Sequence, residues 1–320
     1  NMKYDYKISS NQSFKITYLE EKYIKYFYYP YYYSNNQHIF NPEEFINGIL
    51  NRREINLQYN VEDLKYKRLI GLESYNEDYS SFNIYYPDGN MLQESIFEGQ
   101  DLTINDHNIS LYFYEERNFK DNQILSFGLR IQDIDEKDII LPSLSYLIKG
   151  NNNYNYRISY SYGYRNPSIK ERYYKWQDHF GGPAILGNPD LEPTQNNHFS
   201  ISLDKRTSIN DFSVDIYRND IDNMISTEYI TESDSEDYGQ LHYKNYDEVL
   251  IYGVNVHYYR KITDKLKLKF VYNLTDASSN SNEILEGISK HALRLNLYYK
   301  LLNQLDIVAN IKYAGKKFIF

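Results

Sequence analysis

Residues 154–168 read YNYRISYSYGYRNPS, and this stretch decides the fold. From Tyr154 to Tyr164 every second residue is tyrosine or isoleucine, and the residues between them are polar or glycine. Successive side chains of a β-strand point to opposite faces, so the pattern predicts a strand with one apolar and one polar face. Pro167 cannot donate to a strand ladder, so we expect the strand to end just before it.

The same alternation recurs along most of the chain. It is clear in residues 125–131, 199–203, 265–274 and 305–313, and we count about fourteen such strands. The sequence therefore predicts an all-β, antiparallel, up-and-down fold.

The connections between these strands alternate in length. Short polar turns are expected at 10–12, 61–63, 118–122, 150–153, 207–210, 263–265 and 302–304. Mostly longer connections lie between them, at 28–50, 86–106, 165–196, 221–246 and 276–289, with a shorter one near 135–138. In a meander, alternate connections lie at the same end of the sheet. One end should therefore carry tight turns and the other long loops.

This asymmetry is typical of a transmembrane β-barrel of the outer-membrane type, in which an apolar face meets lipid and a polar face lines the lumen. Tyrosines near strand ends, such as Tyr28, Tyr298 and Tyr313, suit an aromatic girdle at the membrane interface. A soluble sandwich of two sheets shows the same period and stays open as an alternative.

Composition excludes several other classes. No run of about 18 apolar residues is present, which excludes a transmembrane helix. The absence of cysteine removes disulfides and thiolate chemistry, and a net charge of -9 without a basic segment argues against nucleic acid as a partner. No motif of a hydrolase, metalloprotease or phosphate loop occurs, so we predict no enzyme, no cofactor and no metal site. Residues 41–48 hint at a short helix.

A two-part motif follows the opening stretch. Residues 163–171 read GYRNPSIKE and residues 187–193 read GNPDLEP. The pair resembles the barrel of TonB-dependent outer-membrane receptors, and residues 109–130, 216–225, 252–256 and 274–277 are similar to that family's neighbouring strands. Asn166 and Thr194 depart from its usual Ala and Glu.

The resemblance implies a probable 22-stranded barrel of which residues 1–320 form one partial domain, with the plug domain and the last strands absent. It also implies active import, energised by the TonB complex through an N-terminal segment, of a ferric siderophore, cobalamin or haem. The other partner would be outer-membrane lipid, and the protein would be a monomer in the outer membrane. A passive porin or adhesin barrel, or a soluble extracellular β protein, is the alternative from another class.

Candidate ligand contacts lie between the motif halves. The segment RYYKWQDHF, residues 172–180, mixes cations with aromatic rings that could stack on a large polar ligand. We predict loop contacts from Arg172, Tyr174, Trp176 and His179. Some haem receptors of the family carry a histidine there, although a lone histidine in a polar loop is more often solvated. The motif residues themselves are types that form turns, and we expect them to have a structural role, holding the loop closed at the rim of the barrel. A second aromatic cluster, residues 26–33, could also contact ligand, but a membrane girdle and packing within the loop are together the more frequent roles.

Overall fold

The structure is a computed structural model. It describes residues 1–28, 31–34, 37–40, 44–81, 103–134, 137–176, 185–230, 239–280, 289–302 and 304–316, and the side chains of these residues except 27–47, 134, 137 and 175–176.

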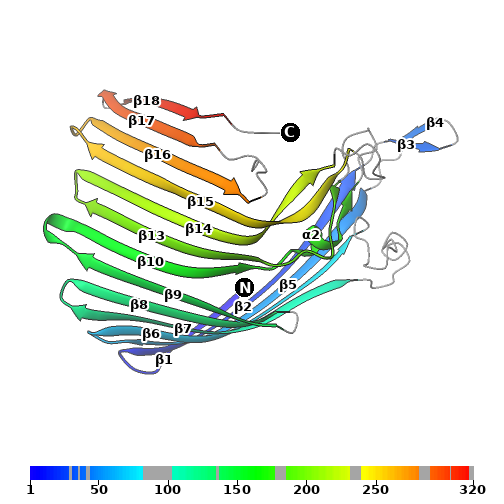
Figure 1. The fold of residues 1–320 in the computed structure, drawn as a ribbon, viewed down its shortest axis with the longest axis horizontal. Helices are drawn as coiled ribbons and strands as arrows, with labels where there is room; N and C mark the ends of the chain where they lie inside the picture. The colour runs from blue at the N-terminus through cyan, green and yellow to red at the C-terminus, as the bar shows by residue number, and fades with distance from the viewer. Residues whose placement is uncertain are drawn as a thin grey trace.

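The chain forms one curved antiparallel sheet in which fourteen strands lie side by side in the order of the sequence (Figure 1). The strands are β1 (Met2–Lys7), β2 (Gln12–Tyr28), β5 (Glu44–Glu62), β6 (Tyr66–Ser81), β7 (Ile104–Lys120), β8 (Gln123–Ile134), β9 (Lys137–Lys149), β10 (Tyr154–Arg165), β13 (Thr194–Arg206), β14 (Asn210–Tyr229), β15 (Leu241–Lys261), β16 (Leu266–Ser279), β17 (His291–Leu302) and β18 (Leu305–Ala314). This confirms the predicted all-β, up-and-down antiparallel architecture.

Six small elements lie in the connections. They are the hairpin β3 (Tyr31–Ser34) and β4 (Gln37–Phe40), the single turn η1 (Asn151–Asn153), the short helix α2 (Ile169–Tyr173), and the two-residue strands β11 (Lys175–Trp176) and β12 (Ile185–Leu186). Except for the β3–β4 hairpin and η1, all of them belong to the connection between β10 and β13.

The two ends of the sheet differ as predicted. At the turn end, connections are a few residues long, and at the turn between β9 and β10 both Asn152 and Asn153 have positive φ, which asparagine tolerates better than most residues. At the loop end, most connections are long. The turn end is thus the end of the sheet with the short connections, and the loop end is the opposite end.

Two details of the prediction are wrong. The expected loop 221–246 is shorter, because β14 and β15 stay paired up to Tyr229 and Leu241, even though Asn223 between them has a left-handed φ of 53°. The expected helix at 41–48 is contradicted at residues 44–48, which belong to β5 and pair with β2; residues 41–43 lie outside the described residues. Cross-strand pairing overrides the weak local helix signal there.

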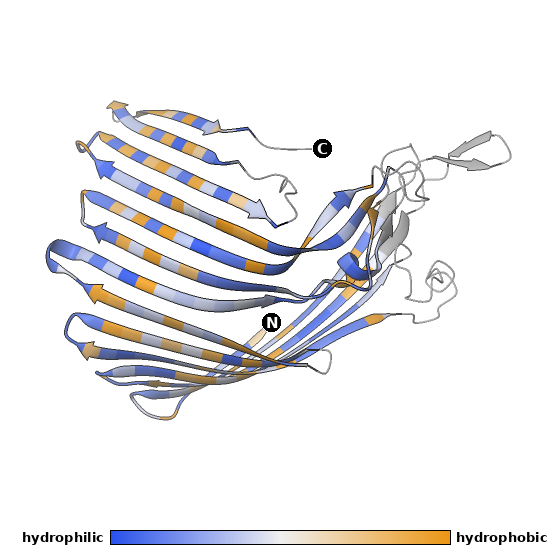
Figure 2. Ribbon diagram, viewed as in Figure 1, coloured by the Kyte–Doolittle hydropathy of each residue, from blue (hydrophilic) through white to orange (hydrophobic). Residues whose placement is uncertain are grey.

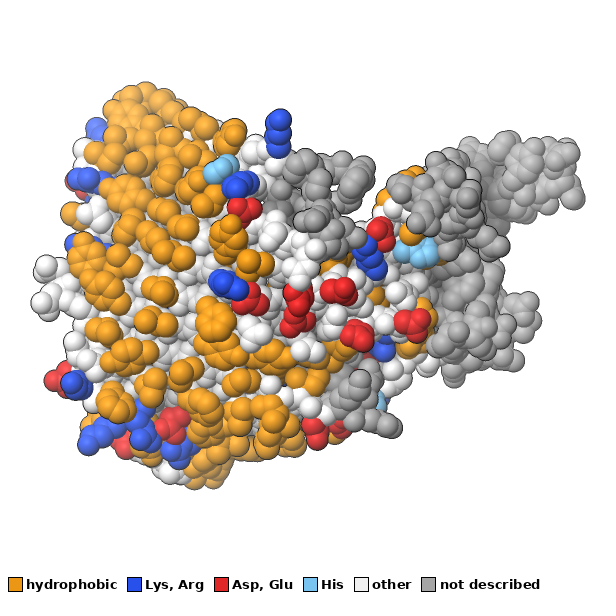
Figure 3. Space-filling model, in the orientation of Figure 1, with side chains coloured by type: hydrophobic (Ala, Val, Ile, Leu, Met, Phe, Trp, Pro, Cys, Tyr) orange, Lys and Arg blue, Asp and Glu red, His pale blue; other side chains and the backbone are white. Residues whose placement is uncertain are grey.

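The register places apolar positions opposite one another on one face, here called the outer face. Tyr156 pairs with Leu203, and Ile158, Ile201 and Ile216 lie in one row across three strands. These three isoleucines are 60%, 59% and 53% exposed. Side chains that are both apolar and exposed, strand after strand, form a continuous belt (Figure 2; Figure 3). Such a belt matches the lipid-facing surface of a membrane barrel.

The opposite, inner face is held by polar contacts between strands. On four neighbouring strands, Arg130 contacts Glu73 and donates to Ser110 at 2.7 Å, while Asn56 donates to Glu73 at 3.1 Å and accepts from the Tyr112 hydroxyl at 2.8 Å. These side chains satisfy one another, so a polar inner wall is stable without a dry core.

Inner-face tyrosines also cover glycines of the adjacent strand. A Cβ on Gly71 would lie 2.2 Å from Tyr112, and one on Gly253 would lie 2.8 Å from the Tyr217 ring. The Tyr217 hydroxyl reaches beyond Gly253 to Thr275, at 3.2 Å. Because glycine leaves this space free, each tyrosine ties together three strands.

No helix in the described part of the chain has both the length and the hydropathy needed to cross a membrane.

Candidate functional site

The connection between β10 and β13, residues 166–193, carries both motif halves and is here called the motif loop. It starts with α2, whose N-cap is Ser168. The Ser168 hydroxyl accepts from the Glu171 backbone N–H at 3.2 Å, and the Glu171 carboxylate accepts from the Ser168 backbone N–H at 2.8 Å. This reciprocal capping box stabilises a helix of only five residues.

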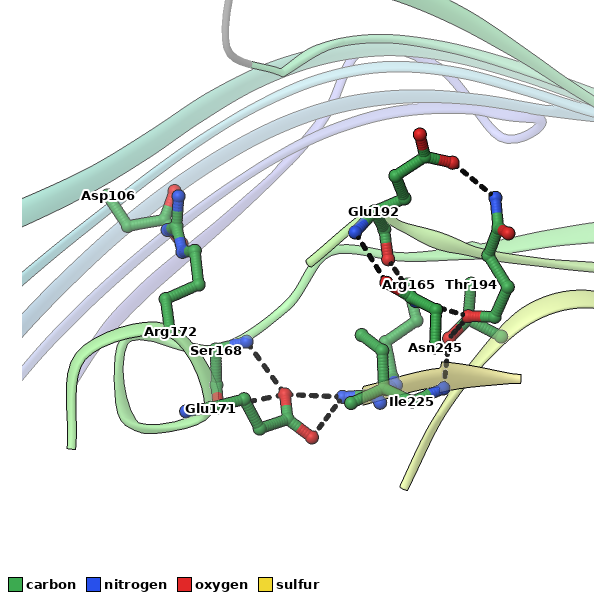
Figure 4. A network of polar contacts seen from close by, with 10 residues as sticks. Asp106, Arg165, Ser168, Glu171, Arg172, Glu192, Thr194, Ile225 and Asn245 are labelled. Atoms are coloured by element: carbon green, nitrogen blue, oxygen red, sulfur yellow. Dashed lines mark hydrogen bonds and ion pairs between the residues drawn. The ribbon is translucent and has the colours of Figure 1, made fainter. Parts of the chain in front are cut away.

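Glu171 also ties α2 back to the strand it follows. Arg165, the last residue of β10, donates to both Glu171 carboxylate oxygens, at 3.0 and 2.8 Å (Figure 4). Burial by itself would raise the pKa of Glu171, but the hydrogen bonds from Arg165 and Ser168 outweigh it and hold the pKa below its usual range. Glu171 therefore stays ionised at neutral pH.

The apolar side of α2 packs on the inner face of β6. Ile169 is 3% exposed and forms a small core with Tyr79, surrounded by Leu50, Ile104 and Tyr173. Lys170 places its ammonium 5.8 Å from the centroid of the Tyr79 ring. The helix thus crosses from β10 to a strand four places away in the sheet.

A partly buried ion pair adds to this contact. Arg172 of α2 lies 3.7 Å from the Asp106 carboxylate of β7, and the two side chains are only 14% and 18% exposed. The Arg172 guanidinium also lies 5.4 Å from the centroid of the Tyr173 ring. Part of the charge of Arg172 is therefore neutralised by Asp106, in a contact that attaches the motif loop to the sheet.

The second half of the motif, which begins at Gly187, lies beside the first half and is hydrogen-bonded to it. The Gly187 N–H donates to the Tyr174 carbonyl at 2.5 Å, and the Asn188 N–H donates to the Glu171 carbonyl at 2.8 Å. A Cβ on Gly187 would lie 2.7 Å from the backbone of both Arg172 and Tyr174, so only glycine fits this close approach.

The second half of the motif loop also pairs with strand β15 of the sheet. β12 pairs in parallel with β15, with Ile185 opposite Leu241 and Leu186 opposite His242. Among the described residues, the ladder between β15 and β16 stops at Val249, so β16 does not continue along the loop-end part of β15. The added strand covers an edge that would otherwise expose backbone hydrogen-bonding groups.

A polar network fixes the end of the motif. Asn245 of β15 accepts from the Glu192 N–H and donates to the Glu192 carbonyl, both at 2.8 Å (Figure 4). Asn223, the residue with left-handed φ in β14, donates to the Glu192 carboxylate at 2.7 Å. Thr194 donates to the Asn223 carbonyl at 2.9 Å and accepts from the Ile225 N–H at 3.2 Å. These two hydrogen bonds hold the backbone on the C-terminal side of Asn223.

The motif loop therefore bridges the loop end of the sheet, with contacts from the inner face of β6 and β7 to the edge of β15. The motif residues hold it there, as expected of a structural staple.

The predicted contacts are placed as follows. Arg172 is paired with Asp106, and Tyr174 is half-buried at the end of α2. The backbone of Trp176 belongs to β11, but its side chain lies outside the described residues, as does all of His179. The structure thus brings the first two together at the C-terminal end of α2, and their role in binding stays a prediction. Of the aromatic cluster at 26–33, only Tyr26 has a described side chain, which is 52% exposed.

His198 of β13 lies on the polar inner face and contacts the Asn219 side-chain oxygen through Nδ1 at 2.8 Å. Among the described residues, no group of three or more His, Asp or Glu side chains is arranged to hold a metal ion.

Sequence reasoning missed α2 and β12. The capping-box signal for α2, Ser168 followed by Glu171, was present in the sequence. No local signal marks the two residues of β12, because their pairing depends on the free edge of β15, far away in the sequence.

A curved meander with an apolar outer face, a polar inner face and loops gathered at one end defines a large outer-membrane β-barrel. The chain matches the family described as "TonB dependent receptor-like, beta-barrel" over residues 1–319. It therefore belongs to the TonB-dependent receptor family, as part of the β-barrel domain, and is an outer-membrane protein. This decides against the soluble and the porin or adhesin alternatives.

Among curated proteins, the chain is 27% identical over 169 residues to the iron-regulated outer membrane virulence protein of Vibrio cholerae, covering 49% of this chain and 26% of that protein. Among solved structures, it resembles the siderophore receptor PirA from Acinetobacter baumannii (TM-score 0.71, 15% identity) and a mutant of the ferric enterobactin receptor PfeA from Pseudomonas aeruginosa (TM-score 0.72, 14% identity). Both matches cover 97% of this chain and 48% of the other, so the chain spans about half the length of these receptors.

Proposed function

We propose that this chain is part of a receptor that imports a ferric siderophore across the outer membrane, energised by the TonB complex. The observation that carries the proposal is the motif loop, which is stapled across the mouth of a barrel whose family consists of transporters and receptors. The siderophore receptors among its structural relatives, and the iron-regulated relative from Vibrio cholerae, support the ligand class.

The long loops and the polar inner face would have different roles in import. The long loops would gather the ligand, and the polar inner face would line its passage without any covalent chemistry. We propose that a plug domain and the remaining strands of the barrel are contributed by sequence outside residues 1–320, that TonB acts through an N-terminal segment of the same protein, and that the receptor is a monomer.

The proposed contacts are Arg172, Tyr174, Trp176 and His179. Arg172 belongs to α2, and Tyr174 caps the C-terminal end of this helix. Aromatic rings would stack on a planar ligand, and the guanidinium would neutralise an anionic one. Cobalamin or haem is the alternative ligand of the same receptor class, and His179 would suit iron ligation in haem.

The test is ligand binding by the protein expressed from its complete gene, with ferric siderophores, cobalamin and haem compared side by side. We expect a ferric siderophore to bind at least tenfold more tightly than the other two. Preference for haem or cobalamin would replace the ligand class, and binding of none would contradict the proposal.

The contact loop is tested by replacing Tyr174, Trp176 and His179 together with alanine. We expect uptake of the bound ligand to fall at least tenfold, and unaltered uptake would remove these residues as contacts.

Arg172 needs a separate control, because it also holds α2 to β7. Arg172→Ala removes both the charge and the ion pair, whereas Asp106→Asn removes only the ion pair. If Arg172 contacts an anionic ligand, binding falls in Arg172→Ala and stays within twofold in Asp106→Asn. Equal losses in the two variants would assign Arg172 to loop attachment alone.

A further inference from the structure

The outer face of β9, β10, β13 and β14 is hollowed by a groove of about 430 Å³. Its walls are almost entirely hydrocarbon and aromatic, and the lipid-facing side chains that line it are Tyr146, Ile148, Tyr156, Ile158, Ile201, Leu203, Val214 and Ile216. The groove is continuous with the apolar belt, so it faces lipid in the membrane.

Paired side chains mark both ends of the groove. Toward the loop end, the rings of Tyr160 and Phe199 lie in contact, with their centroids 4.9 Å apart. Toward the turn end, the Lys205 ammonium lies 4.3 Å from the centroid of the Tyr154 ring. One end of the groove is therefore aromatic and the other carries a positive charge.

The distance between these ends fits one leaflet of a membrane. Six residues separate Tyr154 from Tyr160, which is about 20 Å along a strand. A strand tilt of about 40° reduces this to roughly 15 Å along the membrane normal. A bilayer core of about 30 Å has leaflets of the same depth. Because tight turns of such barrels face the periplasm, the charged end lies at the periplasmic headgroup level.

Lys205 differs from two other cations at the turn end of the outer face, which lie on distant strands. At the turn ends of β6 and β7, Arg68 and Arg117 both pair with Glu115, each at 2.7 Å. Within the described chain, no carboxylate pairs with Lys205, whose neighbour Asp204 faces the other side and binds Asn155 at 2.9 Å. The Tyr154 ring holds the ammonium at the groove while leaving its N–H donors available to a phosphate.

We propose that this groove binds one anionic glycerophospholipid of the periplasmic leaflet. An acyl chain would lie between Tyr156 and Ile216, and the phosphate would meet Lys205. The apolar groove supplies hydrophobic contact with any lipid, and the lysine supplies the preference for a negative headgroup. A surface lysine contributes about 1 kcal/mol to binding of anionic lipid, which corresponds to roughly fivefold.

The test is native mass spectrometry of the protein expressed from its complete gene, released from nanodiscs of equal phosphatidylglycerol and phosphatidylcholine content. We expect retained phosphatidylglycerol to exceed phosphatidylcholine at least fivefold. Lys205→Gln should abolish this preference, and Lys205→Arg should keep it. Arg260→Gln, at the turn end of the outer face but outside the groove, is the matched control and should keep it too.

The groove itself is tested by Val214→Trp, which fills it and should reduce retention of both lipids. Heat-modifiable migration on gels verifies that each variant is folded, and Lys205→Arg carries the test of charge if Val214→Trp does not fold. Equal retention of the two lipids by the unaltered protein, or equal losses in Lys205→Gln and Arg260→Gln, would overturn the proposal. So would a second copy of the protein covering the groove in the lipid-free state.

Discussion

Tyrosine is used in opposite ways on the two faces of the sheet. On the outer face, residues such as Tyr156 and Tyr252 stand out toward lipid, 49% and 47% exposed. On the inner face, Tyr112 and Tyr217 lie flat over glycines and bond to a strand beyond. One residue type therefore serves as a membrane anchor on one side and as a tie between strands on the other. Composition alone cannot distinguish these roles, whereas strand register can.

The largest expected effect comes from a charge in the outer belt. Ile201→Arg should cost about 2–4 kcal/mol if the side chain lies near the bilayer midplane. Ser200→Arg, one residue away on the inner face, should cost little because its side chain enters a polar environment. Urea unfolding in lipid vesicles measures both changes. Equal costs would mean that the assignment of the two faces is incorrect.

The next effect concerns the glycines beneath the inner tyrosines. A Cβ on Gly253 would lie 2.2 Å from the backbone carbonyl oxygen of Leu274, which cannot move aside without breaking the sheet. Gly253→Ala should therefore destabilise by about 1–3 kcal/mol.

Gly71→Ala is the comparison for that variant. Its nearest obstacle is the tip of the Tyr112 ring, which can rotate away at the cost of its bond to Asn56. The loss should be smaller, about 1 kcal/mol. A larger loss for Gly71→Ala than for Gly253→Ala in the same unfolding measurement would contradict this reading.

A third effect is confined to the motif loop and depends on pH. Because the folded state lowers the pKa of Glu171, its ionised form stabilises α2. This stabilisation is complete above the ordinary pKa of glutamate and is lost as the pH falls through the lowered value.

The protection factors of the backbone amides of residues 168–174, which compare each exchange rate with the intrinsic rate at the same pH, should therefore fall under acid conditions. Glu171→Gln should exchange faster already at neutral pH, reflecting about 1 kcal/mol of lost capping, and should respond less to acid. If the protection factors of the variant fell in acid as strongly as those of the unaltered protein, the effect would belong to another group.

The smallest effect is the removal of one hydroxyl. Tyr217→Phe deletes the contact with Thr275 while keeping the ring over Gly253, and should cost about 1 kcal/mol. Tyr156→Phe, on the outer face, should be within 0.5 kcal/mol of no change. Equal costs in thermal unfolding would show that the hydroxyl on the inner face contributes nothing beyond the ring.

Much of the fold could be predicted because strand alternation is local. The run Tyr154–Tyr164 specifies its two faces without reference to any other strand, and the tight turns between strands have recognisable residues. The site was less predictable. Arg172 looked like a free cation in sequence, but its partner Asp106 lies 66 positions away and is brought near only by the fold. β12 likewise depends on where β16 stops pairing with β15.

Strand length varies around the sheet, with 12 residues in β8 and in β10 but 20 and 21 in β14 and β15. Eight further residues add about 25 Å along a strand. The rim is consequently uneven: it is low at β8–β10 and higher on both sides of them, at β5, which has 19 residues, and at β14–β15. The motif loop begins at this low part of the rim, after β10, and packs on longer strands on both sides, β6 and β15. The unequal strand lengths thus supply the walls against which the motif loop is held.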